Sequence, residues 1–246
     1  MFQRASASNT RTIPGAVATL GVSDRLDFIK RTYAHVAGAI FALTGLCYLW
    51  LGPMFESVTI PLLTALGSFG PRGAGLVSLL AFMLASWLAH KWAHSKTSRT
   101  TQYMGLGLYT VAMSFILLPM MVLAQMAMPE ENLIGKAALI TLIMFGGLTV
   151  IAFTVKRDFS LMGKILSACT LGAVGAIFVS FIFGFQLGSL FSGLMIALFG
   201  GWILHDTSNI IRHYPPSYHV GAALSLFSSI AMMFFYVLRM LLGQSR

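Results

Sequence analysis

The chain has 246 residues, of which 57% are hydrophobic and only 9% are charged, and its formal net charge is +9. Soluble domains average roughly 45 to 50% apolar and about 25% charged residues, so this composition excludes an ordinary soluble protein. The basic residues are scattered among short connections and do not cluster beside stacking aromatic residues, which argues against nucleic-acid binding. The composition predicts an integral membrane protein with the lipid bilayer as its main partner.

Seven apolar stretches are long enough to cross the hydrocarbon core, which takes about 20 residues in a helix. Residues 1–28 are predicted to form a flexible cytoplasmic tail, because they lack the apolar core of a signal peptide, and residues 29–246 form one membrane domain. The first connection is half apolar and broken by prolines, which is typical of an interfacial segment. The sequence predicts an all-α membrane protein whose transmembrane helices run from 32 to 55, 73 to 92, 103 to 127, 133 to 155, 161 to 183, 187 to 211 and 218 to 242.

The distribution of Lys and Arg predicts the orientation of these helices, because positive residues near span ends are retained in the cytoplasm. The N-terminal tail and the second, fourth and sixth connections are basic, and all of them fall on one side. The other connections mix acidic and basic residues, namely Glu56, Arg72, Glu130, Glu131 and Lys136. We expect a protein of the cell membrane with its N-terminus in the cytoplasm and its C-terminus outside.

One face of the seventh span is polar over its whole length. At 100° per residue, this stripe consists of Ser225, Ser229, Met232, Tyr236 and Arg239. Polar groups that face lipid are costly, so the stripe should face other helices or a watery cavity. Two interpretations stay open: the stripe lines a pore through Ser225, Tyr236 and Arg239, or it forms hydrogen bonds between helices while Arg239 extends to the interface.

Asp206 differs from the other six acidic residues, which fall in tails, loops or span ends. It should lie one to two turns inside the sixth span, on a face shared with Asn209 and His213. An ionisable residue at this depth is a functional hypothesis by default. All six histidines fall near the same predicted span ends, either as partners of Asp206 or because polar residues are common there, and histidine changes charge near neutral pH. The sequence predicts a pH or ion switch built from Asp206, His205, Asn209, Ser229, His90 and Lys91.

Other kinds of functional site have little support in the sequence. Cys47 and Cys169 lie inside predicted spans, where a free cysteine behaves as a small hydrophobic residue, and they imply no disulfide framework. The sequence has no HExxH motif and no convincing serine-protease arrangement. We therefore expect no metal site, no cofactor, no catalytic residue and no enzymatic activity.

Four stretches resemble the Bax inhibitor-like proteins, also called the transmembrane Bax inhibitor motif family, and point to a bacterial member. The resemblance covers nearly the whole chain from Asp24 onward and rests on DFIKRTYAHVAGAIFALTGL, FTVKRDFSLMG, ILHDTSNIIRHYP and ALSLFSSIAMMFFYVLRML. It implies a bundle of seven helices with the last helix at its centre.

The resemblance also implies a pH-sensitive calcium leak, in which an acid on the sixth helix and an acid on the seventh share a proton. Asp206 matches the first acid, but Ser229 stands at the position of the second. His205 replaces a family tyrosine and Met232 a family asparagine, while His90 or Lys91 lies near a basic family position. With one acid missing, we do not expect tight calcium binding. Two functions stay open: a leak for cations or its regulator, and a non-conducting regulator that binds a membrane protease or a stress-response partner.

Overall fold

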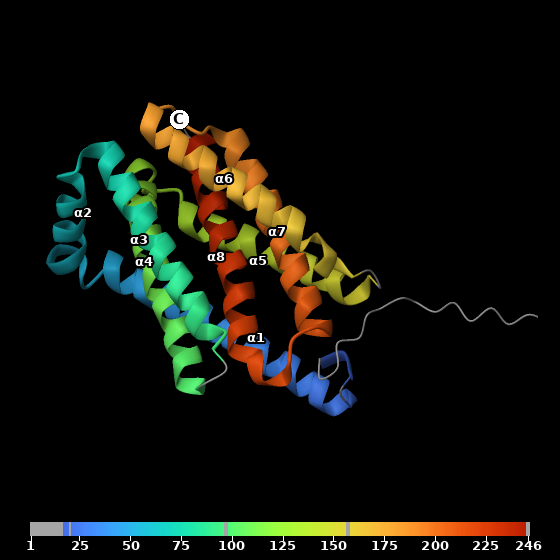
Figure 1. The fold of residues 1–246 in the computed structure, drawn as a ribbon. Helices are drawn as coiled ribbons and strands as arrows, with labels where there is room; N and C mark the ends of the chain where they lie inside the picture. The colour runs from blue at the N-terminus through green and yellow to red at the C-terminus, as the bar shows by residue number, and fades with distance from the viewer. Residues whose placement is uncertain (1–16, 20, 96–97, 156–157, 245–246) are drawn as a thin grey trace, which may run out of the picture.

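The protein is an α-helical bundle, seen here in a computed structural model that describes residues 17–19, 21–95, 98–155 and 158–244 (Figure 1). No strand occurs among these residues. The eight helices are α1 (Val22–Leu51), α2 (Ile60–Gly67), α3 (Gly70–Ala93), α4 (Arg99–Ala127), α5 (Leu133–Thr154), α6 (Gly163–Phe183), α7 (Ser189–Arg212) and α8 (His219–Gln244). All of them except α2 are long and apolar enough to cross a membrane. The prediction of an all-α, seven-span membrane protein is therefore confirmed.

Helix α8 lies at the centre of the bundle, as Figure 1 shows by its position among the other helices. Within its most apolar 18-residue window, 72% of the residues are buried, whereas the other spans reach at most 44%. It packs against α1, α4, α5 and α7, and its contact with α7 is the most extensive in the molecule. The prediction that the last helix is central is confirmed.

The first helix begins at Val22, ten residues before the predicted span, so residues 22–28 are helical and do not belong to a flexible tail. The reason is that these turns have an apolar side: Phe28 is only 3% exposed. Just before the helix, the amide of Val17 donates to the carbonyl of Tyr214 at 3.0 Å, and the Val17 side chain is fully buried. The rest of the predicted tail, residues 1–16 and 20, lies outside the described part of the chain.

The first connection is a short helical segment, as its apolar content and prolines suggested. A five-residue π-helix (Phe55–Thr59) leads directly into α2, and together they are too short to cross a membrane. Thr59 closes this segment onto the end of α1, since its hydroxyl donates to the carbonyl of Trp50 at 2.7 Å. The segment therefore adds no eighth crossing.

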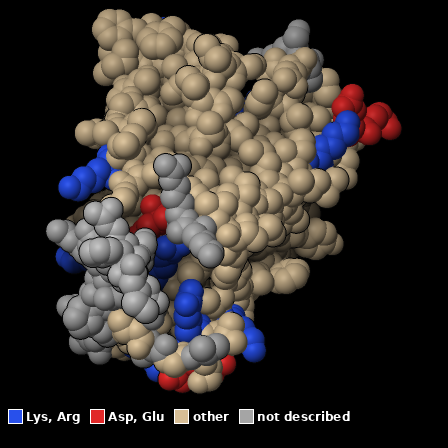
Figure 2. All heavy atoms as spheres, turned by 90° about the vertical axis from the view of Figure 1, so that its right-hand side faces the viewer, with Lys and Arg blue, Asp and Glu red and all other residues tan. Residues whose placement is uncertain are grey.

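Charged residues are sparse on the face that Figure 2 shows, where they lie mainly in the lower half and at the right-hand edge toward the top. We call one end of the bundle the basic end: there α1, α4, α6 and α8 begin and α3, α5 and α7 end. Its described basic residues are Arg25, Lys30, Arg31, Lys91, Arg99, Lys164 and Arg212. The opposite end carries Arg72, Lys136 and Arg239 with Glu56, Glu130 and Glu131. Between the ends, large apolar side chains such as Leu84, Leu171 and Leu194 point outward.

Glycine and alanine allow three helices to approach each other closely near the basic end. A Cβ added to Gly105 of α4 would lie 2.6 Å from the backbone nitrogen of Ala93 on α3. A Cβ on Gly221 of α8 would lie 2.8 Å from the carbonyl oxygen of the same alanine. Helices in lipid associate through such small residues, because burying one apolar surface against another gains little there. The close approach therefore fixes α3, α4 and α8 relative to each other.

We predict that Gly105→Ala destabilises the protein by about 1 to 3 kcal/mol, because the added methyl group meets backbone atoms that cannot move alone. Gly107→Ala is the matched control on the same helix, since a Cβ there meets nothing within 4 Å. The control should leave stability unchanged or raise it by up to about 1 kcal/mol through helix propensity. Thermal unfolding in detergent measures both variants, and equal midpoints would contradict the packing described.

Candidate functional site

The carboxylate of Asp206 lies inside the bundle, between α7 and the central helix. It is 6% exposed and lies six residues before the end of α7, or about 9 Å along the helix axis. Its Oδ2 accepts a hydrogen bond of 2.8 Å from the hydroxyl of Ser229 on α8. The same hydroxyl lies 3.2 Å from the carbonyl oxygen of Ser225, one turn earlier in α8. The structure thus joins two of the predicted switch residues, Asp206 and Ser229.

A tyrosine and a second serine extend this contact toward the basic end. The hydroxyls of Tyr214 and Ser225 lie 3.3 Å apart. Burial, together with the negative charge of Asp206, raises the pKa of Tyr214 to about 12, so its hydroxyl stays protonated. We call Asp206, Tyr214, Ser225 and Ser229 the Asp206 cluster. It holds one carboxyl group among three neutral hydroxyls.

The structure does not pair Asp206 with the basic residues that were predicted to form a latch with it. His90 Nδ1 contacts the carbonyl of Ser86 at 2.9 Å, and its ring packs edge-on against Tyr109. Lys91 Nζ lies 5.0 Å from the centroid of the Trp87 ring. Neither residue is within ion-pair distance of Asp206, although all three belong to the described part of the chain. Residues at the same depth need not face the same neighbour, because each step along a helix turns the side chain by about 100°.

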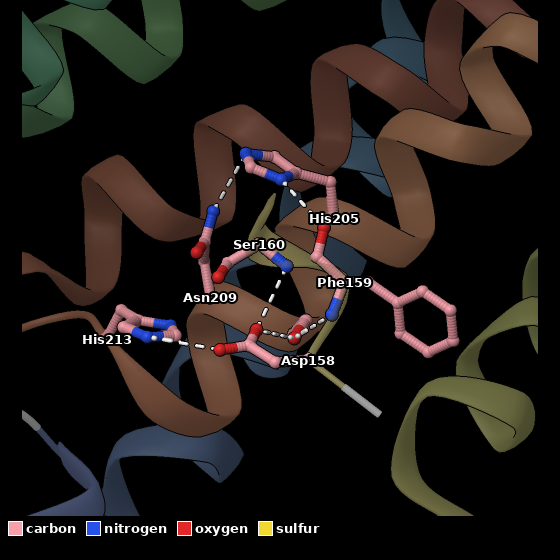
Figure 3. A network of polar contacts seen from close by, with 7 residues as sticks. Asp158, Phe159, Ser160, His205, Asn209 and His213 are labelled. Carbon is pink, nitrogen blue, oxygen red and sulfur yellow. Dashed lines mark hydrogen bonds and ion pairs between the residues drawn. The ribbon is translucent and has the colours of Figure 1, made fainter. Parts of the chain in front are cut away.

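His205 and Asn209 also turn away from Asp206, toward the segment that joins α5 and α6. Asn209 Nδ2 and His205 Nε2 lie 3.0 Å apart, and His205 Nδ1 lies 3.3 Å from the carbonyl oxygen of Phe159 (Figure 3). Phe159 belongs to a 3-10 turn (Phe159–Met162) just before α6. The ring of His205 also packs edge-on against Trp202. The structure therefore does not bring His205 and Asn209 together with Asp206.

A second polar group surrounds Asp158, which precedes this turn, and Figure 3 shows it from close by. Asp158 Oδ1 accepts hydrogen bonds from the amide of Ser160 at 3.0 Å and from the hydroxyl of Ser208 at 3.1 Å. Asp158 Oδ2 lies 3.6 Å from Nε2 of His213, so the two form an ion pair when the imidazole is protonated. We call Asp158, Ser160, Ser208 and His213 the Asp158 cluster. It connects the α5–α6 segment to the end of α7.

The environment of Asp158 favours its charged form. Partial burial raises its pKa, but the hydrogen bonds with Ser160 and Ser208 and the nearby His213 outweigh this effect, so the pKa lies below the usual value of 3.8. This group was not predicted from the sequence, since Asp158 falls in a connection and its partners Ser208 and His213 come about 50 residues later. An aspartate two residues before a serine at a helix start is a recognisable cap pattern. That signal could have identified the turn but not the contact with α7.

The predicted pore stripe of α8 faces α7 and its connections. Ser225 belongs to the Asp206 cluster, and Tyr236 is 2% exposed and packs against the rings of Phe191, Phe199 and Phe235. Arg239 donates from Nη2 to the carbonyl of Leu187 at 2.6 Å. These contacts match the interpretation of the stripe as an interhelical surface, whereas its role as a pore lining stays a prediction.

No site of the metal-binding kind is assembled from the described residues. Among them, no three His, Cys, Asp or Glu side chains come together in a way that could hold a metal ion. Cys47 and Cys169 are both free thiols, the first buried and the second exposed. The two polar clusters are therefore the candidates on which a function can be argued.

Comparison with known proteins identifies relatives over almost the full chain. The sequence model of the family described as "Inhibitor of apoptosis-promoting Bax1" matches residues 25–246. Protein lifeguard 4 of Mus musculus is 26% identical over 98% of this chain and 94% of its own length. An uncharacterized protein of Campylobacter jejuni is 29% identical over 75% of each chain. The BI1-like protein of Arabidopsis thaliana is 30% identical, but the match spans only 53% of that protein and 55% of this one.

The Asp158 cluster generates a prediction on acid stability. Because the pKa of Asp158 is lower in the folded protein, the carboxylate stabilises the fold above the usual value of 3.8, and this contribution is lost as the pH falls through the lowered pKa. We expect Asp158→Asn to lower the free energy of unfolding at neutral pH by about 1 kcal/mol, and therefore to lower the thermal midpoint. On acidification, this variant should lose less stability than the wild type does.

Glu131→Gln is the matched control, because Glu131 pairs with Lys136 while both side chains are more than half exposed. Exposed pairs of this kind contribute little. Thermal unfolding in detergent between neutral pH and pH values below 3.8 measures all three proteins. Parallel curves for Asp158→Asn and the wild type would contradict a stabilising role of the carboxylate.

Proposed function

Because this chain belongs to the Bax inhibitor family of multi-pass membrane proteins, we propose that it is a pH-sensitive leak for cations such as calcium, or the regulator of one. The observation that carries the proposal is the buried carboxylate of Asp206, held by Ser229 across the contact between α7 and α8. Ionisable side chains inside a membrane bundle are rare and are associated with pathways for ions or protons.

The chemistry of Ser229 allows Asp206 to exist in two forms with different hydrogen bonds. A serine hydroxyl can donate one hydrogen bond and accept others, whereas an ionised carboxylate can only accept. With Asp206 ionised, Ser229 donates to it at 2.8 Å. With Asp206 protonated, the acid can donate to Ser229, which then donates to the carbonyl of Ser225 at 3.2 Å. Uptake of one proton thus reverses the direction of the bond between α7 and α8.

This arrangement differs from the acid pair that the family resemblance implies. Ser229 brings no charge, so one proton and one carboxylate control the contact. The basic residues expected as partners, His90 and Lys91, contact other groups and take no part in the proposed switch. The neighbouring Tyr214 stays neutral, since burial raises its pKa to about 12. In this proposal, the Asp206 cluster responds to the proton alone.

The presence of Ser229 at a position where the family resemblance implies an acid also favours a second function. Without an acid at position 229, the bundle can serve as a non-conducting regulator that binds another membrane protein, such as a protease or a stress-response partner. Crosslinking in native membranes distinguishes the two: a stoichiometric partner, together with no flux from purified protein, supports the regulator.

We also propose that the protein is not an enzyme. A serine nucleophile is activated by a neighbouring base such as histidine. Ser229 instead donates to a buried carboxylate, and the histidine next to Asp206 in sequence, His205, points to a different element. Hydrolysis of a model peptide or ester by the purified protein, abolished by Ser229→Ala, would contradict this proposal.

We predict that Asp206→Asn abolishes the pH dependence of calcium flux in liposomes that contain the purified protein. The asparagine keeps an acceptor for Ser229 but cannot exchange a proton. A single titrating group changes the rate by at most roughly tenfold per pH unit, so the wild type should not exceed this slope. Asp158→Asn is the control, because it removes a carboxylate of the other cluster and should keep the pH dependence.

Ser229→Asp changes the other residue of the contact between Asp206 and Ser229. Two carboxylates at hydrogen-bond distance cannot both ionise easily, so this variant should change the pH range over which flux varies. Loaded liposomes with a calcium indicator and a pH series measure all variants. If Asp206→Asn shows the pH profile of the wild type, Asp206 does not have the proposed role.

The charge distribution supports an orientation in the cell membrane with the basic end in the cytoplasm. We predict that a cysteine at Glu130, exposed at the opposite end, reacts with a membrane-impermeant maleimide in intact cells. A cysteine at Ser23, exposed at the beginning of α1, should react only after permeabilisation. Both changes are made in a background with Cys47→Ser and Cys169→Ser. The reverse labelling pattern would mean that the orientation is inverted.

A further inference from the structure

A large cavity lies at the end of the bundle opposite the basic end, away from both polar clusters. Its volume is about 930 Å³, and its walls come from α3, α4, α6, α7, α8 and the loop between α6 and α7. Figure 1 places the ends of α6 and α8 in the same region, at the top of the bundle. Two arginines, Arg72 and Arg239, line the cavity, and none of its described lining residues is a carboxylate.

Arg239 reaches the cavity from the last turns of the central helix. One guanidinium nitrogen donates to the carbonyl of Leu187 in the α6–α7 loop at 2.6 Å, and the guanidinium carbon lies 5.9 Å from the centroid of the Phe191 ring. A guanidinium has five N–H donors, so most of them are left for another partner. Arg239 is partly buried, and a positive charge withdrawn from water needs a counter-charge.

Arg72 reaches the same loop from the first turn of α3. Its guanidinium lies directly over Gly184, where an added Cβ would collide with it. Gly184 ends α6 with a φ of 76°, a left-handed conformation that suits glycine, so this residue both turns the chain and leaves space for the arginine. Gly184 and Leu187 are three residues apart, so their Cα atoms are separated by at most about 11 Å. The two guanidinium groups are therefore held along one short loop.

The surroundings of the two arginines leave their charge unbalanced. Neither is within ion-pair distance of a carboxylate among the residues that the structure describes. The acidic residues of this end, Glu56, Glu130 and Glu131, do not line the cavity, and Glu131 is paired with Lys136. Helix α7 begins on the cavity wall at Ser189 without a side-chain cap, which adds the positive end of its dipole.

We infer that this cavity binds a phosphate group, held between Arg72 and Arg239. The planar fork of a guanidinium matches the geometry of phosphate oxygens, and two such groups at one site suit a phosphate better than a single exposed cation does. Other walls of the cavity are apolar, with Leu123, Ile177 and Phe235 among the lining residues. The site therefore suits the headgroup of an anionic phospholipid as well as free phosphate. This site is independent of the proposed leak, since it contains none of the Asp206 cluster.

The test compares phosphate ligands and variants of the purified, full-length chain. Nanodiscs of phosphatidylcholine with a small fraction of phosphatidylglycerol supply the lipid form, and native mass spectrometry measures how much of each lipid is retained. Inorganic phosphate in phosphatidylcholine nanodiscs supplies the free form, with the thermal midpoint as the measurement. The variants are Arg72→Gln and Arg239→Gln, and Lys136→Gln is the control because it removes a cation of the same end that lies outside the cavity.

Each arginine variant should weaken binding by at least roughly tenfold, because a hydrogen bond to a charged group contributes about 1.5 to 3 kcal/mol. Lys136→Gln should bind as the wild type does. Phosphatidylglycerol retention that depends on both arginines identifies a lipid headgroup as the source, and a phosphate-induced midpoint shift with the same dependence identifies free phosphate. Equal binding by Arg72→Gln and the wild type would overturn the inference. Arg72 is exposed and the variant should fold normally, so this outcome is decisive even if Arg239→Gln is unstable.

Discussion

The hydrogen bond from Ser229 to Asp206 is the contact on which the arrangement of the central helix depends. Inside a bilayer, water does not satisfy a polar group, so each buried donor or acceptor must find a partner in the chain. Asp206 is buried on α7, and its hydrogen-bond partner lies on α8. The same requirement explains why the polar stripe of α8 faces α7, with which it has its most extensive contact. The packing of the molecule and its candidate chemistry therefore share one interface.

Small residues fix the beginning of the central helix, near the basic end. Ala93 of α3 is fully buried and lies against both Gly105 of α4 and Gly221 of α8. This close approach brings His94 to Gly221 and places its ring 6.4 Å from that of Tyr214. Tyr214 in turn contacts Ser225 in the Asp206 cluster. The glycine contacts at the basic end thus hold in place the side chains that surround the buried acid, although none of the glycines carries chemistry itself.

Periodicity and apolar length were enough to predict the seven spans and the burial of Asp206, because these properties belong to single helices. The central position of α8 was instead implied by the family resemblance. The contact between Asp206 and Ser229 was implied by the family resemblance, because the two residues stand at the positions of an acid pair shared by the sixth and seventh helices. The partners His90, Lys91 and His205 were assigned by depth, and depth does not determine which neighbouring helix a side chain faces. Asp158 was missed because its contacts with Ser208 and His213 depend on how a connection folds back onto α7. Sequence patterns do not contain that information.

The charged side chains at the two ends of the bundle have different surroundings. At the basic end, Asp158 has hydrogen bonds and a histidine, and its lowered pKa shows that these outweigh partial burial. Deeper in the bundle, Asp206 accepts its hydrogen bond from a neutral hydroxyl, that of Ser229. At the opposite end, Arg72 and Arg239 line a cavity to which the described residues contribute no carboxylate, and the proposed phosphate would supply the counter-charge there. A proton can neutralise a buried carboxylate. An arginine stays charged at any physiological pH, so only an anion can balance its charge.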